Sequence, residues 1–363
     1  MCHHCRGVHI HGWSKTKHVI VGLWARLHLN VSRGFLDDAA NSTVESNGGV
    51  PVTVGYYNLP LLKAPHWKWQ VPLYFFFSGL ASTAFLFSTI ADWFGDDDDA
   101  PVVAAGRYLA LAGVLASLPL LIDDLGRPER FVHMLRVFKM RSPMSVGAWA
   151  LTFFGGFAGL AATMQARADG IPGASMLPVP TGRAVRNVVG FAGAPFAVLV
   201  AGYTGVLLAA TSIPLWGRMR SYLAPIFFLS GSSSALSAIT IAILSMGKGR
   251  RSTTNKLRDL EVLIITGELV VESLALRHAG EFARPLIARP WGQLFWIGSI
   301  GIGQIVPLVI HTRHLFGFRR HSRVLDVVAA LATLAGGFST RLVWVNAGKT
   351  SAADPAAAFA YHQ

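Results

Sequence analysis

The amino-acid sequence predicts an all-α integral membrane protein with eight transmembrane helices in two tandem four-helix bundles. Of the 363 residues, 52% are hydrophobic and only 14% are charged, whereas soluble domains carry about 25% charged residues. Several apolar stretches of about 20 residues are long enough to cross a hydrocarbon core of about 30 Å as helices. The predicted spans are residues 71–94, 102–122, 145–165, 187–210, 222–246, 260–277, 292–311 and 324–345.

A polar tail, residues 1–50, precedes the first span. It has no apolar run of signal-peptide quality, so we expect it to be disordered, or translation to start nearer Val44 or Val50. Cys2 and Cys5, in the sequence MCHHC, offer the alternative of a metal site. No second cysteine pair follows, so we predict no metal.

The net charge of +13 admits two interpretations. A nucleic-acid surface is one of them. The basic residues, however, lie in short loops between spans, where they set topology and contact anionic lipid headgroups. We therefore expect lipid and not nucleic acid as the partner of these charges. Eight spans place both termini on one side of the membrane, and the distribution of basic residues slightly favours the outside.

An internal repeat underlies the prediction of two bundles. The sequence FFFSGLAS at 75–82 returns as FFLSGSSS at 227–234, and other features recur at an offset of about 150 residues. A unit of four spans keeps its orientation when duplicated, so the two units should be related by an axis along the membrane normal. We assign residues 51–210 and 211–346 to the two bundles and 347–363 to a C-terminal tail. The small residues of the repeat let helices approach closely.

Three acidic residues interrupt the sixth span. Glu261, Glu268 and Glu272 lie seven and four positions apart, on one face of a helix. A carboxylate near the bilayer centre must face the protein interior, be protonated, or have a cationic partner. Arg107 and Arg341 are the candidate partners. Glu268 is therefore either part of a structural ion pair or a proton relay.

A charged loop joins the second and third spans. Gly126 permits a tight turn and Pro128 can begin a new helix, so we expect a short interfacial helix within residues 123–144 that docks a partner protein. The acidic run 96–99 is expected to be only a solvated loop. The charged loop carries Asp123, Asp124, Arg127, Glu129, Arg130 and His133.

Aromatic and polar residues gather just before the first span, as HWKWQ at 66–70. Tryptophan and lysine commonly anchor helices at the membrane interface. The alternative is the mouth of a pocket for a lipid-soluble ligand, in which an aromatic ring stacks on the ligand and His66 or a lysine contacts its oxygen.

Several motifs in this order resemble the NrfD family, the membrane subunits of polysulfide reductase-like and nitrite reductase-like complexes. The resemblance covers about residues 50–355 and is fairly specific only when the motifs are taken together. They are Tyr56-Tyr57 with Pro60, Lys63, Pro65, Trp67, Trp69, Pro72 and Tyr74; DLGRP at 124–128; SPMS at 142–145 with Gly147 and Trp149; YTG at 203–205 with Pro214 and Trp216; and Arg341 with Ala347, Gly348, Ser351 and Asp354-Pro355.

The resemblance implies a quinone-binding subunit in the bacterial cell membrane, with no haem or iron–sulfur cluster of its own. Its quinone would be menaquinone or ubiquinone. Its partners would be a four-cluster iron–sulfur subunit and a molybdopterin catalytic subunit, and it would pass electrons between the iron–sulfur protein and the quinone, with proton transfer. The positions of the histidines agree with a subunit that carries no haem, because haem-carrying membrane subunits need histidines inside their spans. Here His66, His133, His278, His311 and His314 lie at span ends or in loops.

Carried over by position, the quinone pocket lies where the first span begins and the fourth passes. The resemblance implies that His66, Trp67, Trp69, Tyr74, Tyr203 and Arg127 bind quinone, and that Asp123, Asp124 and His133 serve proton transfer, to which the charge analysis adds Glu268. Two other functions remain open: a secondary transporter built on two repeats with Glu268 as coupling residue, and a structural anchor without quinone chemistry.

Overall fold

The computed structural model describes residues 62–63, 65–124, 129–176, 178–313 and 322–362. All described residues lie within one compact unit. The expectations for the N-terminal tail, including Cys2 and Cys5, therefore lie outside the described residues.

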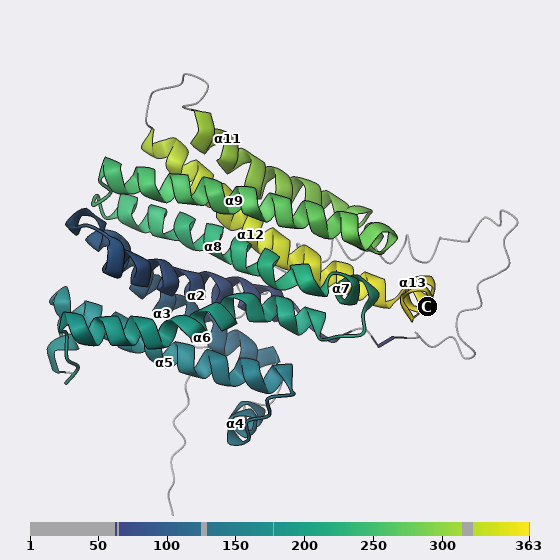
Figure 1. The fold of residues 1–363 in the computed structure, drawn as a ribbon, viewed down its shortest axis with the longest axis horizontal. Coiled ribbons are helices and arrows are strands. Elements are labelled where there is room, and N and C mark those ends of the chain that lie inside the picture. The colour runs from purple at the N-terminus through teal and green to yellow at the C-terminus, as the bar shows by residue number, and fades with distance from the viewer. Residues whose placement is uncertain (1–61, 64, 125–128, 177, 314–321, 363) are drawn as a thin grey trace, which may run out of the picture. The chain divides into compact units, whose positions relative to one another are not determined.

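All regular elements in the described ranges are helices, as the sequence predicts, and the long ones run side by side (Figure 1). Ser142 caps one of them, accepting a hydrogen bond from the backbone N–H of Ser145, and Pro143 follows at the first helical position. The long helices are α2 (Gln70–Phe94), α3 (Ala100–Asp124), α5 (Pro143–Ala168), α6 (Arg183–Ala209), α8 (Arg220–Ser245), α9 (Arg251–Ala279), a π-helix labelled η4 (Leu294–Ile305) that continues into α11 (Val306–Thr312), and α12 (Arg323–Ala352).

Short helices join the long ones. A helix does lie within the loop 123–144, as predicted, and it is α4 (Glu129–Arg136). The others are η1 (Asp97–Asp99), η2 (Ala174–Met176), α7 (Pro214–Arg218), η3 (Gly280–Ala283), α10 (Arg284–Ile287) and α13 (Pro355–His362).

Seven helices of the described chain are long and apolar enough to cross a membrane. They include α2, α3, α5, α6, α8 and α12, together with the continuous segment Leu294–Thr312. Helix α9 has 29 residues and is long enough, but it is not among the seven. The predicted span 260–277, which lies in α9, is therefore not confirmed by length and composition.

Equivalent positions of the internal repeat contact each other between α2 and α8. The rings of Phe75 and Phe227 meet edge to face, with centroids 6.2 Å apart. The hydroxyl of Thr83 donates a 2.9 Å hydrogen bond to the carbonyl oxygen of Gly231. Helix α8 also packs against α6, α9 and α12, so the helices form one body around α2 and α8. The division into two bundles remains a prediction.

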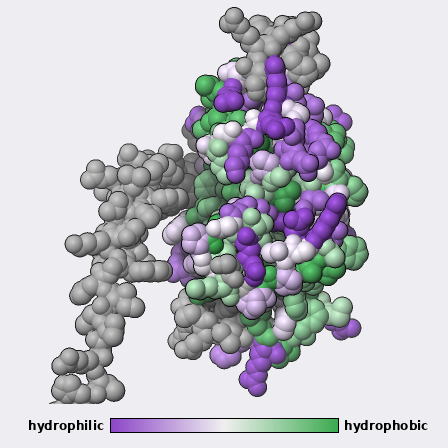
Figure 2. All heavy atoms as spheres, turned by 90° about the vertical axis from the view of Figure 1, so that its left-hand side faces the viewer, coloured by the Kyte–Doolittle hydropathy of each residue, from purple (hydrophilic) through white to green (hydrophobic). Residues whose placement is uncertain are grey.

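The long helices alternate in direction, so their termini gather at two ends. We call one the η1 end, where α2 turns into α3, and the other the α7 end, where α6 turns into α8 (Figure 1). Figure 2 looks onto the η1 end, where hydrophilic side chains gather among apolar ones.

The expectation that residues 96–99 form only a solvated loop is wrong. They form η1 with a capping box, and they hold the start of α9. Lys256 Nζ lies 3.0 Å from a carboxylate oxygen of Asp96 and 2.9 Å from one of Asp99. Arg250 pairs with Asp98. The run of four acidic residues does not indicate which basic residues pair with it, because those residues lie about 150 positions away in the sequence.

Candidate functional site

Two tyrosines from different helices meet near the α7 end. Tyr74 is buried on α2, one turn after the buried Gln70. Tyr203 of α6 lies close enough to interact with it electrostatically. The Tyr203 ring covers the backbone of Gly147 on α5, where a Cβ atom would lie 1.9 Å from Cζ. Within the described part of the chain, neither tyrosine hydroxyl has a hydrogen-bond partner. Glycine at 147 thus makes room for a phenol with a free hydroxyl.

The acidic end of α3 lies beside the start of α2. The side-chain amide of Gln70 donates a 2.9 Å hydrogen bond to Oδ2 of Asp123. Its own oxygen, Oε1, is buried and has no partner among the described residues. Asp124 accepts a hydrogen bond from the backbone N–H of Lys68. Asp123 is exposed, so the row from Asp123 through Gln70 to Tyr74 runs from solvent into the protein.

Trp67 packs into the helical body. Its ring stacks on Trp216 with centroids 5.4 Å apart, and Trp216 donates a 2.9 Å hydrogen bond to the carbonyl oxygen of Trp344. Lys349 donates a hydrogen bond to the carbonyl oxygen of Trp67. A Cβ at Gly348 would lie 2.0 Å from the Trp216 ring. The structure thus gives Trp67 a packing role at the start of α2.

Other predicted site residues are spread more widely. His66 and Trp69 are exposed before α2, and His133 is exposed on α4. Arg127 lies outside the described residues. The structure thus brings together Tyr74, Tyr203, Asp123 and Asp124 near the α7 end, and leaves the roles of the other four as predictions. No group of three or more His, Cys, Asp or Glu side chains in the described ranges is placed to hold a metal ion.

Glu268 lies in a second polar cluster, between α9, α8 and α12. It accepts a 3.4 Å hydrogen bond from Ser233 and interacts with Ser230. The buried Arg341 donates to Ser230 Oγ and to the carbonyl oxygens of Phe227 and Gly337, the last two at 3.0 Å. Of the two arginines that the sequence offers as partners, Arg341 is therefore the one beside Glu268.

Gln304 joins Glu268 to Glu272. Its side-chain amide donates a 2.9 Å hydrogen bond to Oε2 of Glu272 and interacts with Glu268. Gln304 is carried by the π-helix, a rare conformation that is frequent at functional sites. A glutamine in a glycine-rich apolar segment gave no pattern from which this contact could be predicted.

Glu261 is enclosed nearer the η1 end. Its Oε1 accepts hydrogen bonds from Ser237 at 2.5 Å and Thr333 at 3.0 Å. Its Oε2 lies 3.2 Å from Nε2 of His311 on α11. The one-face spacing of the three glutamates is confirmed, since all three are buried.

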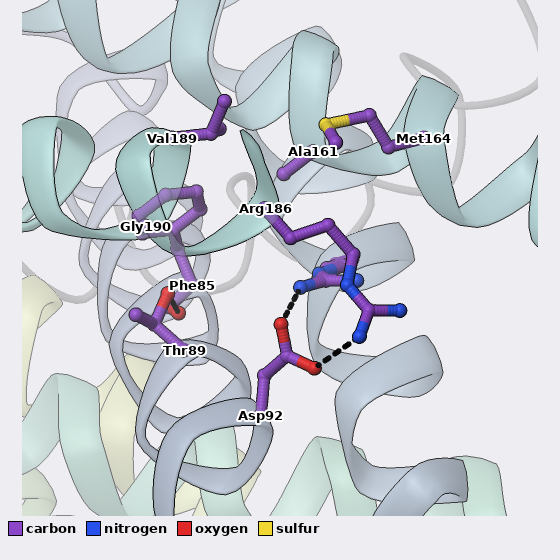
Figure 3. Close-up of a pocket in the computed structure, with 9 residues that line it drawn as sticks. Phe85, Thr89, Asp92, Ala161, Met164, Arg186, Val189 and Gly190 are labelled. Atoms are coloured by element: carbon purple, nitrogen blue, oxygen red, sulfur yellow. Dashed lines mark hydrogen bonds and ion pairs between the residues drawn. The ribbon is translucent and has the colours of Figure 1, made fainter. Parts of the chain in front are cut away.

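Arg107 pairs with Asp92 and not with Glu268 or Glu272. Asp92 lies 2.6 Å from Arg107 and 3.5 Å from Arg186, and Gln165 accepts a further 2.9 Å hydrogen bond from Arg107. A cavity of about 10 Å³ adjoins these groups, large enough for about one water molecule (Figure 3). Phe85 and Met164 are among its apolar lining residues. Asp92 was not singled out from the sequence, because a carboxylate at a predicted span end is common.

Comparison with known proteins adds to this geometry. The model of the family described as "Polysulphide reductase, NrfD" matches residues 62–353. The C component of polysulfide reductase from Wolinella succinogenes is 28% identical, over 78% of this chain and 94% of its own length. The C component of selenate reductase from Mesobacillus selenatarsenatis is 26% identical, over 72% and 71%. Protein NrfD of Escherichia coli is 25% identical, over 79% and 96%.

Proposed function

The chain belongs to the NrfD family and is a multi-pass membrane subunit of an oxidoreductase, and we propose that it is the subunit that reacts with quinone. In this proposal it passes electrons between a partner iron–sulfur protein and a menaquinone or ubiquinone in the membrane. The reductase names of its relatives support the redox class. The proposed quinone site is argued from the positions of Tyr74, Tyr203 and Gln70.

The pairing of Tyr74 with Tyr203 carries the proposal. Each hydroxyl is free of a described partner, and Gln70 leaves a buried oxygen unpaired in the same region. Buried polar groups normally have a hydrogen-bond partner, so the tyrosine hydroxyls fit the carbonyl oxygens of a quinone, and the Gln70 oxygen fits the hydroxyl group of a quinol. A quinone, when bound, supplies the two-electron chemistry and takes up two protons on reduction.

The tyrosines would bind and orient the ligand. Each hydroxyl can donate to a carbonyl oxygen, and a donor in a site with little water stabilises charge that develops there. The stacked Trp67 and Trp216 fix the start of α2, and with it the position of Tyr74. His66, Trp69 and Arg127 remain proposed contacts for the quinone at the outer side of the pocket.

The carboxylates of α3 would move the protons. Asp123 is exposed and contacts Gln70, so it can exchange a proton with water at the α7 end. Asp124 accepts a hydrogen bond from the backbone of Lys68, and Lys68 and Lys349 are close enough to interact with it electrostatically. Its carboxyl group is proposed to take up and release a proton. Either group can act as general acid or base when within reach of the substrate oxygen or a bridging water. His133 is proposed as a further exchange site at this surface.

The partner proteins would dock at the α7 end, so that the nearest redox centre faces the tyrosine pair. We propose a four-cluster iron–sulfur subunit, joined to a molybdopterin catalytic subunit. The segment between α4 and α5, which is part of the predicted docking loop 123–144, exposes Val137, Phe138 and Met140 and so gives apolar contact area. The relatives are named as single components of polysulfide reductase and selenate reductase, which is consistent with multi-subunit enzymes.

We also propose that α9 is the eighth span, in the bacterial cell membrane. Its three glutamates, which lower its hydropathy, are each turned inward and bonded to neighbouring helices. A helix whose acidic residues are covered by protein can cross the bilayer.

A photoreactive quinone analogue tests the proposed site. Applied to membranes that contain the complete complex, it should label peptides of the first turns of α2 or the Tyr203 region of α6. Excess natural quinone should prevent this labelling. Label confined to other helices, or label that excess quinone does not displace, would favour a structural anchor or the transporter alternative.

A further inference from the structure

The polar cluster between α8, α9, the π-helix and α12 contains one more negative group than positive groups. Glu268 and Glu272 are each 2% exposed, and Arg341 is 1% exposed. When both carboxylates are ionised, one guanidinium leaves a net charge of −1 in the interior. An uncompensated buried charge is unfavourable, so it is paired or neutralised. The cluster is therefore one positive charge short.

Charged groups on the surrounding helices do not supply that charge. His311 on α11 lies against Glu261. Lys256 and Arg250 are bound to the acidic residues of η1, at the η1 end. Arg218 on α7 is exposed, and the exposed Glu281 on η3 is acidic and adds no positive charge. Among the described residues, Arg341 is the cation that acts on both Glu268 and Glu272.

Two oxygen atoms in the cluster also lack a donor. Oε1 of Glu272 and Oε1 of Gln304 are buried and have no partner within the described part of the chain. Gln304 contacts both carboxylates through its amide, so the unpaired oxygens belong to the same connected group. An O–H in this group would give one of them a donor and would remove the excess negative charge at the same time.

We propose that Glu268 and Glu272 form a binding site for one exchangeable proton inside the membrane. In the loaded site, one carboxyl group is neutral and the other is a carboxylate paired with Arg341. Loading transfers a proton from a hydronium ion to a carboxylate oxygen and leaves water. Release reverses this step. The site is separate from the tyrosine pair and adds an intramembrane proton store to the proposed quinone chemistry.

Neighbouring groups indicate the direction in which the proton is exchanged. Glu261 lies seven residues before Glu268 on α9, about 10 Å along the helix, and its carboxylate contacts the imidazole of His311. The hydroxyls of Ser237 and Thr333 bond to Glu261. The next titratable side chain along α9 therefore lies toward the η1 end, opposite the tyrosine pair and Asp123.

Infrared spectroscopy of the complete complex in membranes tests the site without use of its activity. At neutral pH the spectrum should contain the carbonyl band of a buried carboxylic acid, shifted in D₂O. The band should disappear in Glu268→Gln or Glu272→Gln and persist in Glu281→Gln, which changes an exposed glutamate. A hydrophobic carbodiimide, which attacks protonated carboxyl groups, should label the same residues.

The possible outcomes distinguish a bound proton from a bound metal cation, and they test this proposal separately from the quinone site. Sodium ions at neutral pH should change neither band nor label. Loss of both on addition of sodium would mean that the missing charge is a metal cation and would overturn the proposal. A spectrum without the band, from a complex that retains its subunits, would also overturn it. Since quinone photolabelling reports on the tyrosine pair alone, failure there leaves this result unaffected.

Discussion

Gly79 of α2 and Gly231 of α8 occupy equivalent places in the internal repeat and bring the backbones of their helices into contact. A Cβ atom on Gly231 would lie 3.2 Å from the carbonyl carbon and oxygen of Gly79. Such close approach is typical of helices packed in a membrane, where apolar burial alone gives little driving force. The contact explains why the glycines recur in both copies of the repeat.

Glycine-to-alanine substitutions should destabilise the protein in a graded manner. Overpacking costs about 1–3 kcal/mol, so Gly231→Ala should lower the thermal midpoint in detergent. Gly336→Ala should lower it more, because its Cβ would lie 2.0 Å from Cα of Gly303 in the π-helix. Gly156→Ala is the matched control, because nothing lies within 4 Å of its added methyl group. Equal midpoints for all three variants would contradict the close backbone contacts.

The ion pairs of Asp92 and of Asp98 at the η1 end should differ strongly in their contribution to stability. Asp92→Asn leaves Arg107 and Arg186 without their common carboxylate, and breaking a buried pair costs about 3–5 kcal/mol. Asp98→Asn removes the carboxylate partner of the exposed Arg250, and exposed pairs contribute about 0–1 kcal/mol. Thermal denaturation monitored by size-exclusion chromatography measures both variants. A smaller effect for Asp92→Asn than for Asp98→Asn would be incompatible with the burial seen here.

Tyr203→Phe should reduce turnover with quinol and leave turnover with a soluble dye unchanged. The ring still covers Gly147, so packing is preserved, and only the hydroxyl is lost. A hydrogen bond is worth about 0.5–1.5 kcal/mol, so the rate or apparent affinity should fall several-fold. Tyr108→Phe is the control, because its hydroxyl bonds to Asp169 at the η1 end. Unchanged quinol turnover in Tyr203→Phe would place the pocket elsewhere.

Asp124→Asn should affect proton transfer more than quinone binding. The substitution keeps the shape of the side chain and its contact with the backbone of Lys68, but removes a proton acceptor. Quinol turnover should fall while the apparent quinone affinity changes little, and dye turnover should stay constant. Equal losses with quinol and dye would instead indicate a folding defect.

The purified protein should show no haem absorbance and no iron–sulfur signal of its own. The expectation comes from the positions of its histidines and cysteines in the sequence. Optical and electron paramagnetic resonance spectra of the protein, recorded after separation from its partners, test this expectation. A stoichiometric b-type spectrum would be decisive against it.

Much of the fold could be predicted because it depends on local composition. Long apolar segments specify the helices, and the resemblance of FFFSGLAS to FFLSGSSS identifies the repeat, although only the structure shows that its two copies contact each other. The face shared by the three glutamates also follows from their spacing. These features need only helical periodicity and the dominance of apolar burial.

The partners of polar groups could not be predicted in the same way. The choice of Arg341 over Arg107 for Glu268 depends on how α12 is rotated against α8. The contact of Gln304 with Glu272 depends on the π-helix, whose wider turns no apolar pattern reveals. The binding of residues 96–99 to α9 depends on a contact between distant segments.

The contact of Lys349 with the carbonyl oxygen of Trp67 has a consequence for biosynthesis. The two residues are 282 positions apart, and the ring on which Trp67 stacks is itself held by the carbonyl oxygen of Trp344. A ribosome that adds about 5–20 residues per second needs roughly 14–56 s to cover that interval. Throughout this time the start of α2 lacks its final neighbours, so α2, the first of the described helices to emerge, is among the last to reach its native surroundings. A nascent chain that stops before α12 should therefore expose Trp67 to insertases and membrane proteases.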